Sequence, residues 1–367
     1  MNIFRPALKG AFSILAASAL ILTGCGKAAT PAASDSPSPT VSSSAAASSS
    51  PAADKKLKVV ASFYPMYEFA RQVGGDYAEV TALIGGGVEP HDWEPTPKDI
   101  TAIQDADLFV YNGGVESWVE KVLESTPNAE RVVVQANAGI TLLTEAAEEE
   151  GAEHDHAHEG EAAHDHDPAH EDEHTDEHAH EEEHAHDHDH DHGGIDPHVW
   201  LSPVLAQKEV QTIADAFMKA DPANKEAYQK NADAYITKLK ELDSAFKAGL
   251  QNVKRKDFIT QHAAFAYLAE EYGLKQVPIA GLSPEQEPSP EKMADIIKFA
   301  KENNVKTIFF ETLVDPKIAK TIAEEVGAGT AVLNPIEGLT DEDAQKGLDY
   351  IGIMTNNLEA LKKALNE

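Results

Sequence analysis

Two stretches of this chain alternate short apolar segments with helical ones, and this alternation restricts the possible folds more than any other feature. In the first stretch, four apolar segments are expected to form buried strands, at residues 58–63, 79–84, 107–111 and 131–135. In the second stretch the scheme is repeated at residues 258–261, 275–279, 307–311 and 330–333. Short apolar strands separated by helices are typical of parallel sheets covered on both faces. The sequence therefore predicts an α/β protein with one lobe over residues 55–221 and a second over residues 254–367.

A segment without strands between the two stretches predicts one long helix. It begins at Asp221-Pro222, where an N-cap residue precedes a proline suited to the first helical turn. Its large apolar residues recur at helical spacing, as on one face of a helix; they are Tyr228, Tyr235, Leu239, Leu242, Phe246 and Leu250. A helix over residues 222–253 would be about 48 Å long at 1.5 Å per residue. We interpret it as a rigid strut between the lobes; the alternative is an ordinary core helix.

The first 54 residues are predicted to be an export signal and a tether. Arg5 and Lys9 precede an apolar run at residues 11–22 that is too short to span a bilayer as a mature helix. The run ends shortly before Cys25, the single cysteine of the chain, in a pattern that resembles a bacterial lipobox. The resemblance implies removal of residues 1–24 and lipidation of Cys25, and the alternative is a membrane anchor with an incidental cysteine. Residues 25–54 are almost wholly Ala, Ser, Pro and Thr, so we expect a disordered tether and an extracytoplasmic protein anchored to the bacterial cell membrane.

A segment dense in histidine and acidic residues interrupts the first lobe at residues 145–194. The chain has 63 Asp and Glu against 30 Lys and Arg, a net charge of −33, and 21 of the acids lie within residues 145–192. This charge disfavours nucleic acid as a partner and favours cations. Fourteen of the 17 histidines lie here, and we expect them to make weak accessory metal contacts from a disordered loop. They are His154, His156, His158, His164, His166, His170, His174, His178, His180, His184, His186, His188, His190 and His192. The alternative is an acidic loop that only increases solubility.

Two copies of the H-E-x-x-H pattern in this loop, at residues 170–174 and 180–184, do not indicate a metalloprotease. That motif functions on a buried helix, which fixes its two histidines against a third ligand. Neither copy has apolar flanking residues with which to dock on a core. Chance matches are expected in a segment so rich in His and Glu.

The three histidines outside the loop are the candidate metal ligands. His91 follows the second strand, His198 lies where the acidic loop ends, and His262 ends the first strand of the second half. Open α/β sheets bind ligands at the carboxyl ends of their strands. His91 and His198 each follow a proline and precede a tryptophan by two residues, which favours a fixed imidazole. The alternative for each histidine alone is a packed or capping residue.

These motifs resemble those of the cluster A-I metal-binding lipoproteins of ABC importers, in the zinc branch of ZnuA and AdcA type. The resemblance covers residues 55–367, the lipobox and the position of the His-rich loop. It implies two (β/α) lobes with parallel sheets joined by a long rigid helix, and one metal in the interlobe cleft. Carried over by motif, the ligands are His91, His198, His262 and, after the last strand, Glu337.

The resemblance also implies which metal is bound. Manganese-type relatives carry Glu at the position of His262, and three imidazoles with one carboxylate favour zinc. Water is the alternative to Glu337 in the fourth position. Glu311, which ends a strand, is expected to have a structural role, as a partner of a cation or of backbone donors.

The function implied by this resemblance is transport, and we expect no enzymatic activity. The protein is expected to capture Zn²⁺ with high affinity and hand it to an ABC permease, as a monomer. One alternative is a secreted zinc-dependent hydrolase with a His₃ site, which requires an open coordination position and a general base. The other alternative is a manganese-selective, adhesin-like or storage lipoprotein. The number of bound metal ions tests for storage, since an importer component is expected to have one tight site and a storage protein many weak ones.

Overall fold

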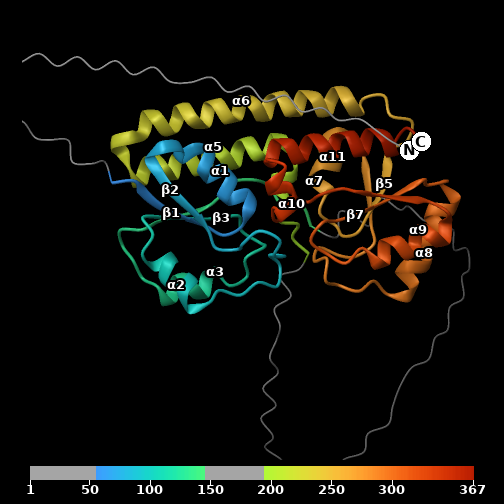
Figure 1. The fold of residues 1–367 in the computed structure, drawn as a ribbon, viewed down its shortest axis with the longest axis horizontal. Helices are drawn as coiled ribbons and strands as arrows, with labels where there is room; N and C mark the ends of the chain where they lie inside the picture. Colours follow the sequence, from blue (N-terminus) through green and yellow to red (C-terminus); the bar gives the residue numbers. More distant parts are fainter. Residues whose placement is uncertain (1–54, 145–193) are drawn as a thin grey trace, which may run out of the picture. The chain divides into compact units, whose positions relative to one another are not determined.

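The computed structural model describes residues 55–144 and 194–367 (Figure 1). The predicted signal peptide, Cys25, the tether and the 14 histidines of the acidic loop lie outside the described residues. Within the described part, no helix combines the length and the apolar character needed to cross a membrane.

The first lobe is built on a sheet of four parallel strands in the order β2-β1-β3-β4. The strands are β1 (Leu57–Ala61), β2 (Ala78–Ala82), β3 (Leu108–Tyr111) and β4 (Val132–Gln135). The helices of this lobe are α1 (Tyr64–Gly74), α2 (Pro97–Gln104), α3 (Val119–Ser125) and α5 (Pro203–Ala220), with a 3₁₀ turn, η1, at Gly75–Tyr77. Because side chains alternate along a strand, Leu108 and Val110 join the core under α1 and α5, whereas Phe109 packs with α2 and α3 on the other face.

The second lobe repeats this plan, with the strand order β6-β5-β7-β8 and all neighbours parallel. Its strands are β5 (Asp257–Thr260), β6 (Lys275–Pro278), β7 (Thr307–Phe310) and β8 (Gly329–Val332). Its helices are α7 (Ala266–Tyr272), α8 (Pro290–Glu302), α9 (Lys317–Val326), α10 (Asp341–Gln345) and α11 (Tyr350–Ala364). Ile259 and Ile308 pack with α8 and α9, and Phe258 and Phe309 pack on the opposite face. The prediction of two α/β lobes with parallel sheets is confirmed.

A long helix connects the lobes. The 3₁₀ turn η3 (Pro222–Asn224) leads into α6 (Lys225–Leu250), which has 26 residues and ends three residues before the predicted Val253. Helix α6 packs against α1 and α5 of the first lobe and against α7 and α11 of the second (Figure 1). All six of its predicted apolar residues are buried, and they join residues of both lobes in one continuous core. The helix is therefore a shared part of the interior, as the strut interpretation requires.

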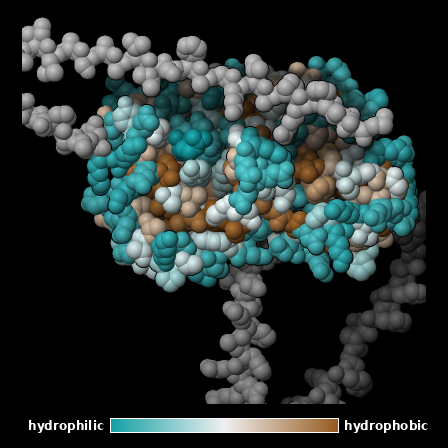
Figure 2. All heavy atoms as spheres, viewed as in Figure 1, coloured by the Kyte–Doolittle hydropathy of each residue, from teal (hydrophilic) through white to brown (hydrophobic). Residues whose placement is uncertain are grey.

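The surface carries few large apolar side chains. On the face drawn in Figure 2, hydrophilic residues surround smaller groups of apolar ones. The exposed large hydrophobic residues of the described part are scattered along the chain; they are Tyr77, Val88, Val133, Ile195 and Val332.

Candidate metal centre

Four residues from separate loops meet between the lobes. His91 lies in the loop from β2 to α2, and His198 is the N-cap of the 3₁₀ turn η2 (Val199–Leu201), which leads into α5. His262 lies two residues after the end of β5, and Glu337 lies in the loop from β8 to α10. One donor atom from each lies within 4.8 Å of the other three. Each lobe supplies two members, so the complete cluster exists only where the lobes meet.

The distances within this cluster match those of tetrahedral zinc coordination. Oε1 of Glu337 lies 3.2, 3.3 and 3.4 Å from the Nε2 atoms of His91, His198 and His262 respectively. Nε2 of His198 lies 3.4 Å from Nε2 of both other histidines. Zinc–nitrogen bonds of 2.0–2.1 Å in a regular tetrahedron place the donor atoms about 3.3 Å apart. Five of the six donor–donor distances therefore match the edges of a zinc tetrahedron, and the sixth, between His91 and His262, lies within 4.8 Å.

The cluster is almost completely removed from solvent. The side chain of His91 is 10% exposed, and those of His198, His262 and Glu337 are 0% exposed. Access from solvent is therefore on the side of His91.

Asp196 orients the imidazole of His198. Its Oδ1 atom accepts from Nδ1 of His198 at 2.7 Å and from the backbone N–H of the same residue at 2.8 Å. The backbone carbonyl of Asp196 in turn accepts from the hydroxyl of Tyr267 on α7. A proton held on Nδ1 leaves Nε2 as the free metal-binding nitrogen. Burial acts to lower the pKa of His198, but Asp196 and Glu337 together raise it above the ordinary value.

Glu311 performs the same task for His262. Its Oε1 atom accepts from Nδ1 of His262 at 2.5 Å and from the backbone N–H at 3.1 Å. Burial opposes a charge on His262, yet Glu311 and then Glu337 raise its pKa well above the ordinary value. Glu311 is not a member of the four-residue cluster; it lies beyond the ring that it orients.

Glu337 supplies the negative charge of the cluster itself. Burial acts to raise the pKa of this carboxyl, but His262 and the other two histidines hold it well below the ordinary value. Three imidazole nitrogens and an anionic oxygen thus lie close enough together to bind one divalent cation. The carboxylates that favour a proton on the imidazoles equally favour a divalent metal ion in its place.

For Asp196 the orienting role was not predicted from the sequence, although a local signal existed. An acid, a proline and a histidine follow one another at Glu89-Pro90-His91 and again at Asp196-Pro197-His198. In the structure both acids turn back to their histidine, since Glu89 accepts from the backbone N–H of His91 at 3.0 Å. Glu311 lacks this signal, because it lies 49 residues from His262. Its position at the end of a strand instead predicted a structural role, and its bonds to the backbone N–H and to Nδ1 of His262 agree with that prediction.

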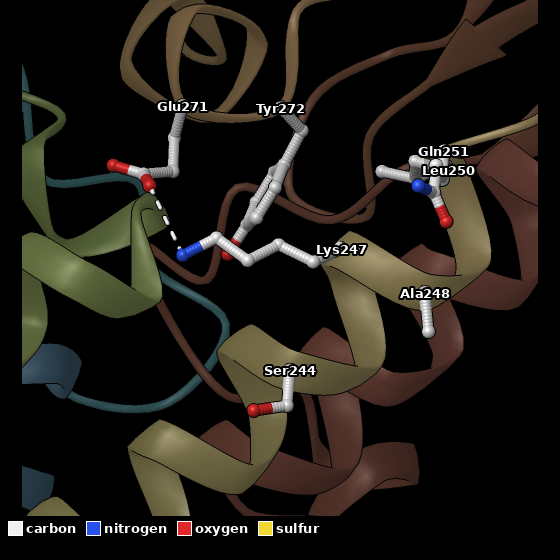
Figure 3. Close-up of a pocket in the computed structure, with 7 residues that line it drawn as sticks. All are labelled: Ser244, Lys247, Ala248, Leu250, Gln251, Glu271 and Tyr272. Atoms are coloured by element: carbon white, nitrogen blue, oxygen red, sulfur yellow. Dashed lines mark ion pairs between the residues drawn. The ribbon is translucent and has the colours of Figure 1, made fainter.

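The hollow drawn in Figure 3 is separate from this cluster. It measures about 540 Å³ and lies between α6 and α7, where its side chains include Lys247, Glu271 and Tyr272. Lys247 pairs with Glu271 at 3.6 Å and with Asp243 at 2.9 Å. Asp243 and Glu271 neutralise the positive charge of Lys247 in this hollow. None of the four cluster residues lines the hollow.

The fold and the cluster together define a class: a two-lobed α/β protein that holds one metal ion between its lobes. Comparison with known proteins identifies the family. Residues 59–364 match the ZnuA family, described as the periplasmic component A of the zinc-uptake complex, and the chain belongs to this family.

Individual relatives agree with this assignment. The chain is 47% identical over 353 residues to the high-affinity zinc uptake system protein ZnuA of Bacillus subtilis, covering 96% of each chain. It is 44% identical over 316 residues to the zinc-binding lipoprotein AdcA of Streptococcus pneumoniae, covering 86% of this chain but only 57% of AdcA. The crystal structure of the Zn(II)-bound ZnuA-like domain of S. pneumoniae AdcA matches with a TM-score of 0.66 at 40% identity, covering 85% of this chain and 100% of that domain.

Family membership confirms the resemblance inferred from the sequence motifs. The family consists of extracytoplasmic components of transport complexes, so the prediction of a non-enzymatic transport protein is also confirmed.

Proposed function

We propose that this chain captures Zn²⁺ outside the cytoplasm and delivers it to the permease of an ABC importer. The observation that carries the proposal is a set of four donor atoms, three of them on fully buried side chains, in which five of the six donor–donor distances are 3.2 to 3.4 Å, as in tetrahedral zinc sites. The family description and the names of the B. subtilis and S. pneumoniae relatives support zinc as the cargo.

In this proposal the ligands are His91, His198, His262 and Glu337. Imidazole nitrogens suit zinc better than magnesium, calcium or manganese, which prefer oxygen ligands. With Glu337 in the fourth position, no coordination position is left for a catalytic water, which favours capture over hydrolysis. Anomalous scattering at the zinc edge from metal-bound crystals tests this assignment. One ion bonded to these four side chains supports it, and an ion bound elsewhere contradicts it.

The remaining parts of the proposal concern residues outside the described ranges. Cys25 carries a lipid that anchors the protein to the cell membrane, and residues 25–54 connect the anchor to a monomeric two-lobed body with no affinity for nucleic acid. The name of the AdcA relative, which includes the word lipoprotein, supports this arrangement. The 14 histidines of the loop are accessory sites that bind zinc weakly near the main site.

Glu337→Gln is expected to lower zinc affinity by about 100-fold, because the amide keeps the shape of the side chain but removes its charge. Competition with a chromophoric chelator measures the Kd of the tight site. Glu342→Gln is the matched control, since Glu342 is an exposed acid on α10 that pairs with Lys346. An unchanged Kd for Glu337→Gln would show that water, not this carboxylate, completes the shell.

Deletion of residues 152–191 is expected to leave one tight zinc per molecule and remove the weaker ones. Residues 152–191 have no large apolar side chain with which to pack on a core, so we expect each of their metal contacts to be weaker than those of a preformed site. Tethered imidazoles raise the local zinc concentration, so the uptake rate at low zinc should fall more than the equilibrium affinity. Equilibrium dialysis counts the bound ions, and loss of the tight one would mean that the loop supplies primary ligands.

A further inference from the structure

The loop that carries Glu337 contains a backbone conformation that its residue type disfavours. Ile336 has a φ of 61°, in the left-handed region, and its side chain is fully buried. In the described part of the chain only one other non-glycine residue, Asn304, has a positive φ, and asparagine tolerates it. A β-branched residue persists in this conformation only where its surroundings hold it. The contacts around Ile336 therefore determine where Glu337 lies.

Two asparagines hold this loop from the side of the second lobe. Oδ1 of Asn334 accepts from the backbone N–H of Ile336 at 2.7 Å. Asn357 on α11 contacts both backbone groups of Asn334, since its Nδ2 donates to the carbonyl at 2.7 Å and its Oδ1 accepts from the N–H at 2.9 Å. Strand β8 ends at Val332, so the amide of Asn357 replaces a neighbouring strand at Asn334. Asn357 is only 2% exposed, so water competes little for these hydrogen bonds.

The first lobe holds the same loop from the other side. Nε1 of Trp200 donates to the carbonyl of Pro335 at 2.8 Å. The carbonyl of Trp200 accepts from the hydroxyl of Tyr350, which begins α11. Trp200 lies two residues after His198, so a ligand segment of the first lobe contacts the ligand loop of the second.

We propose that Asn357 is a positioning residue for the metal site, which acts through Asn334 and Ile336 to hold the Glu337 carboxylate against the three imidazoles. The inference rests on the proposed role of Glu337 as a ligand. Only an amide side chain offers a donor and an acceptor side by side. Aspartate at position 357 would place an oxygen against the carbonyl of Asn334, and alanine would leave both backbone groups without this partner.

The test uses the full-length chain with Asn357→Ala and Asn357→Asp, each made alone and together with Glu337→Gln. Asn356→Ala is the matched control, because Asn356 is the exposed neighbour on the same helix. Competition with a chelator gives the zinc Kd, and the visible spectrum of bound Co²⁺ reports whether the coordination is tetrahedral. We expect Asn357→Ala to weaken zinc binding about 10- to 100-fold and to reduce the tetrahedral Co²⁺ absorption. In the Glu337→Gln background the same change should alter affinity by no more than about threefold, because the group that it positions is gone.

The outcomes separate this inference from the proposed function. Unchanged affinity in Asn357→Ala, or equal losses in both backgrounds, would overturn the role of Asn357 while leaving Glu337 as a ligand. Unchanged affinity in Glu337→Gln alone would instead overturn the proposed role of Glu337. If Asn357→Ala does not fold, Asn357→Asp keeps the volume of the side chain and decides the question, since unchanged affinity in that variant contradicts the inference.

Discussion

His262→Ala is expected to weaken zinc binding by more than the roughly 10- to 100-fold that loss of an outer-shell partner costs, because His262 is a proposed ligand of the metal itself. The variant also leaves Glu311 buried without the imidazole that it orients at 2.5 Å. Calorimetric titration of the purified protein with zinc, in competition with a strong chelator, measures the loss.

Two further measurements make the His262 result interpretable. Glu270→Ala, at an exposed position on α7, should retain the Kd of the unmodified protein. Circular dichroism of the metal-free His262→Ala protein should show that the fold persists. High-affinity binding that survives in a folded His262→Ala protein would contradict the proposed ligand set.

Phe246→Ala should lower the free energy of unfolding by about 3–5 kcal/mol, as expected for truncation of a fully buried aromatic side chain. Phe246 lies in the second half of α6 and stacks on Tyr272 of α7 at a centroid distance of 5.1 Å. Because the core is continuous between the lobes, the loss should destabilise both of them together. Chemical denaturation measures the change.

The positions of the tryptophans allow the two lobes to be followed separately. Trp93, Trp118 and Trp200 all belong to the first lobe, and of these Trp200 also bonds to Pro335 and Tyr350 of the second. Their fluorescence therefore reports mainly on the first lobe, whereas circular dichroism reports on both. In Phe246→Ala the two signals should shift to lower denaturant together. Ser244→Ala, an exposed change half a turn away, should shift neither by more than about 0.5 kcal/mol. A fluorescence transition that stays in place while the dichroism transition moves would mean that the lobes unfold independently.

The features that could be predicted from the sequence are those that a local pattern specifies. Four consecutive apolar residues predict a strand such as Leu108–Tyr111, and Asp221-Pro222 marks the approach to the long helix. The candidate ligands stood out for a similar reason, because only three histidines lie outside the acidic loop. Glu337 came from resemblance to a family motif and not from any property of its own neighbourhood.

The features that could not be predicted depend on contacts between distant segments. Glu311 meets His262 only because β7 pairs with β5 and brings their carboxyl ends to the same edge. Asn357 looks like any polar residue of an amphipathic helix until α11 is placed beside the end of β8. The positive φ of Ile336 has no signal in the residue itself, which is a poor candidate for that conformation. Such positions are set by the packing of the whole chain.

The burial of the four donor atoms determines what an incoming ion must lose. An ion held by four protein atoms, three of them from side chains without solvent exposure, keeps none of the water molecules that surround it in solution. Magnesium gives up its hydration shell reluctantly and requires six ligands in an octahedron. We therefore expect even a large excess of magnesium outside the cell to compete poorly for this site. The free-energy cost of removing its water ligands exceeds the free energy that it gains by binding to three imidazoles and a carboxylate.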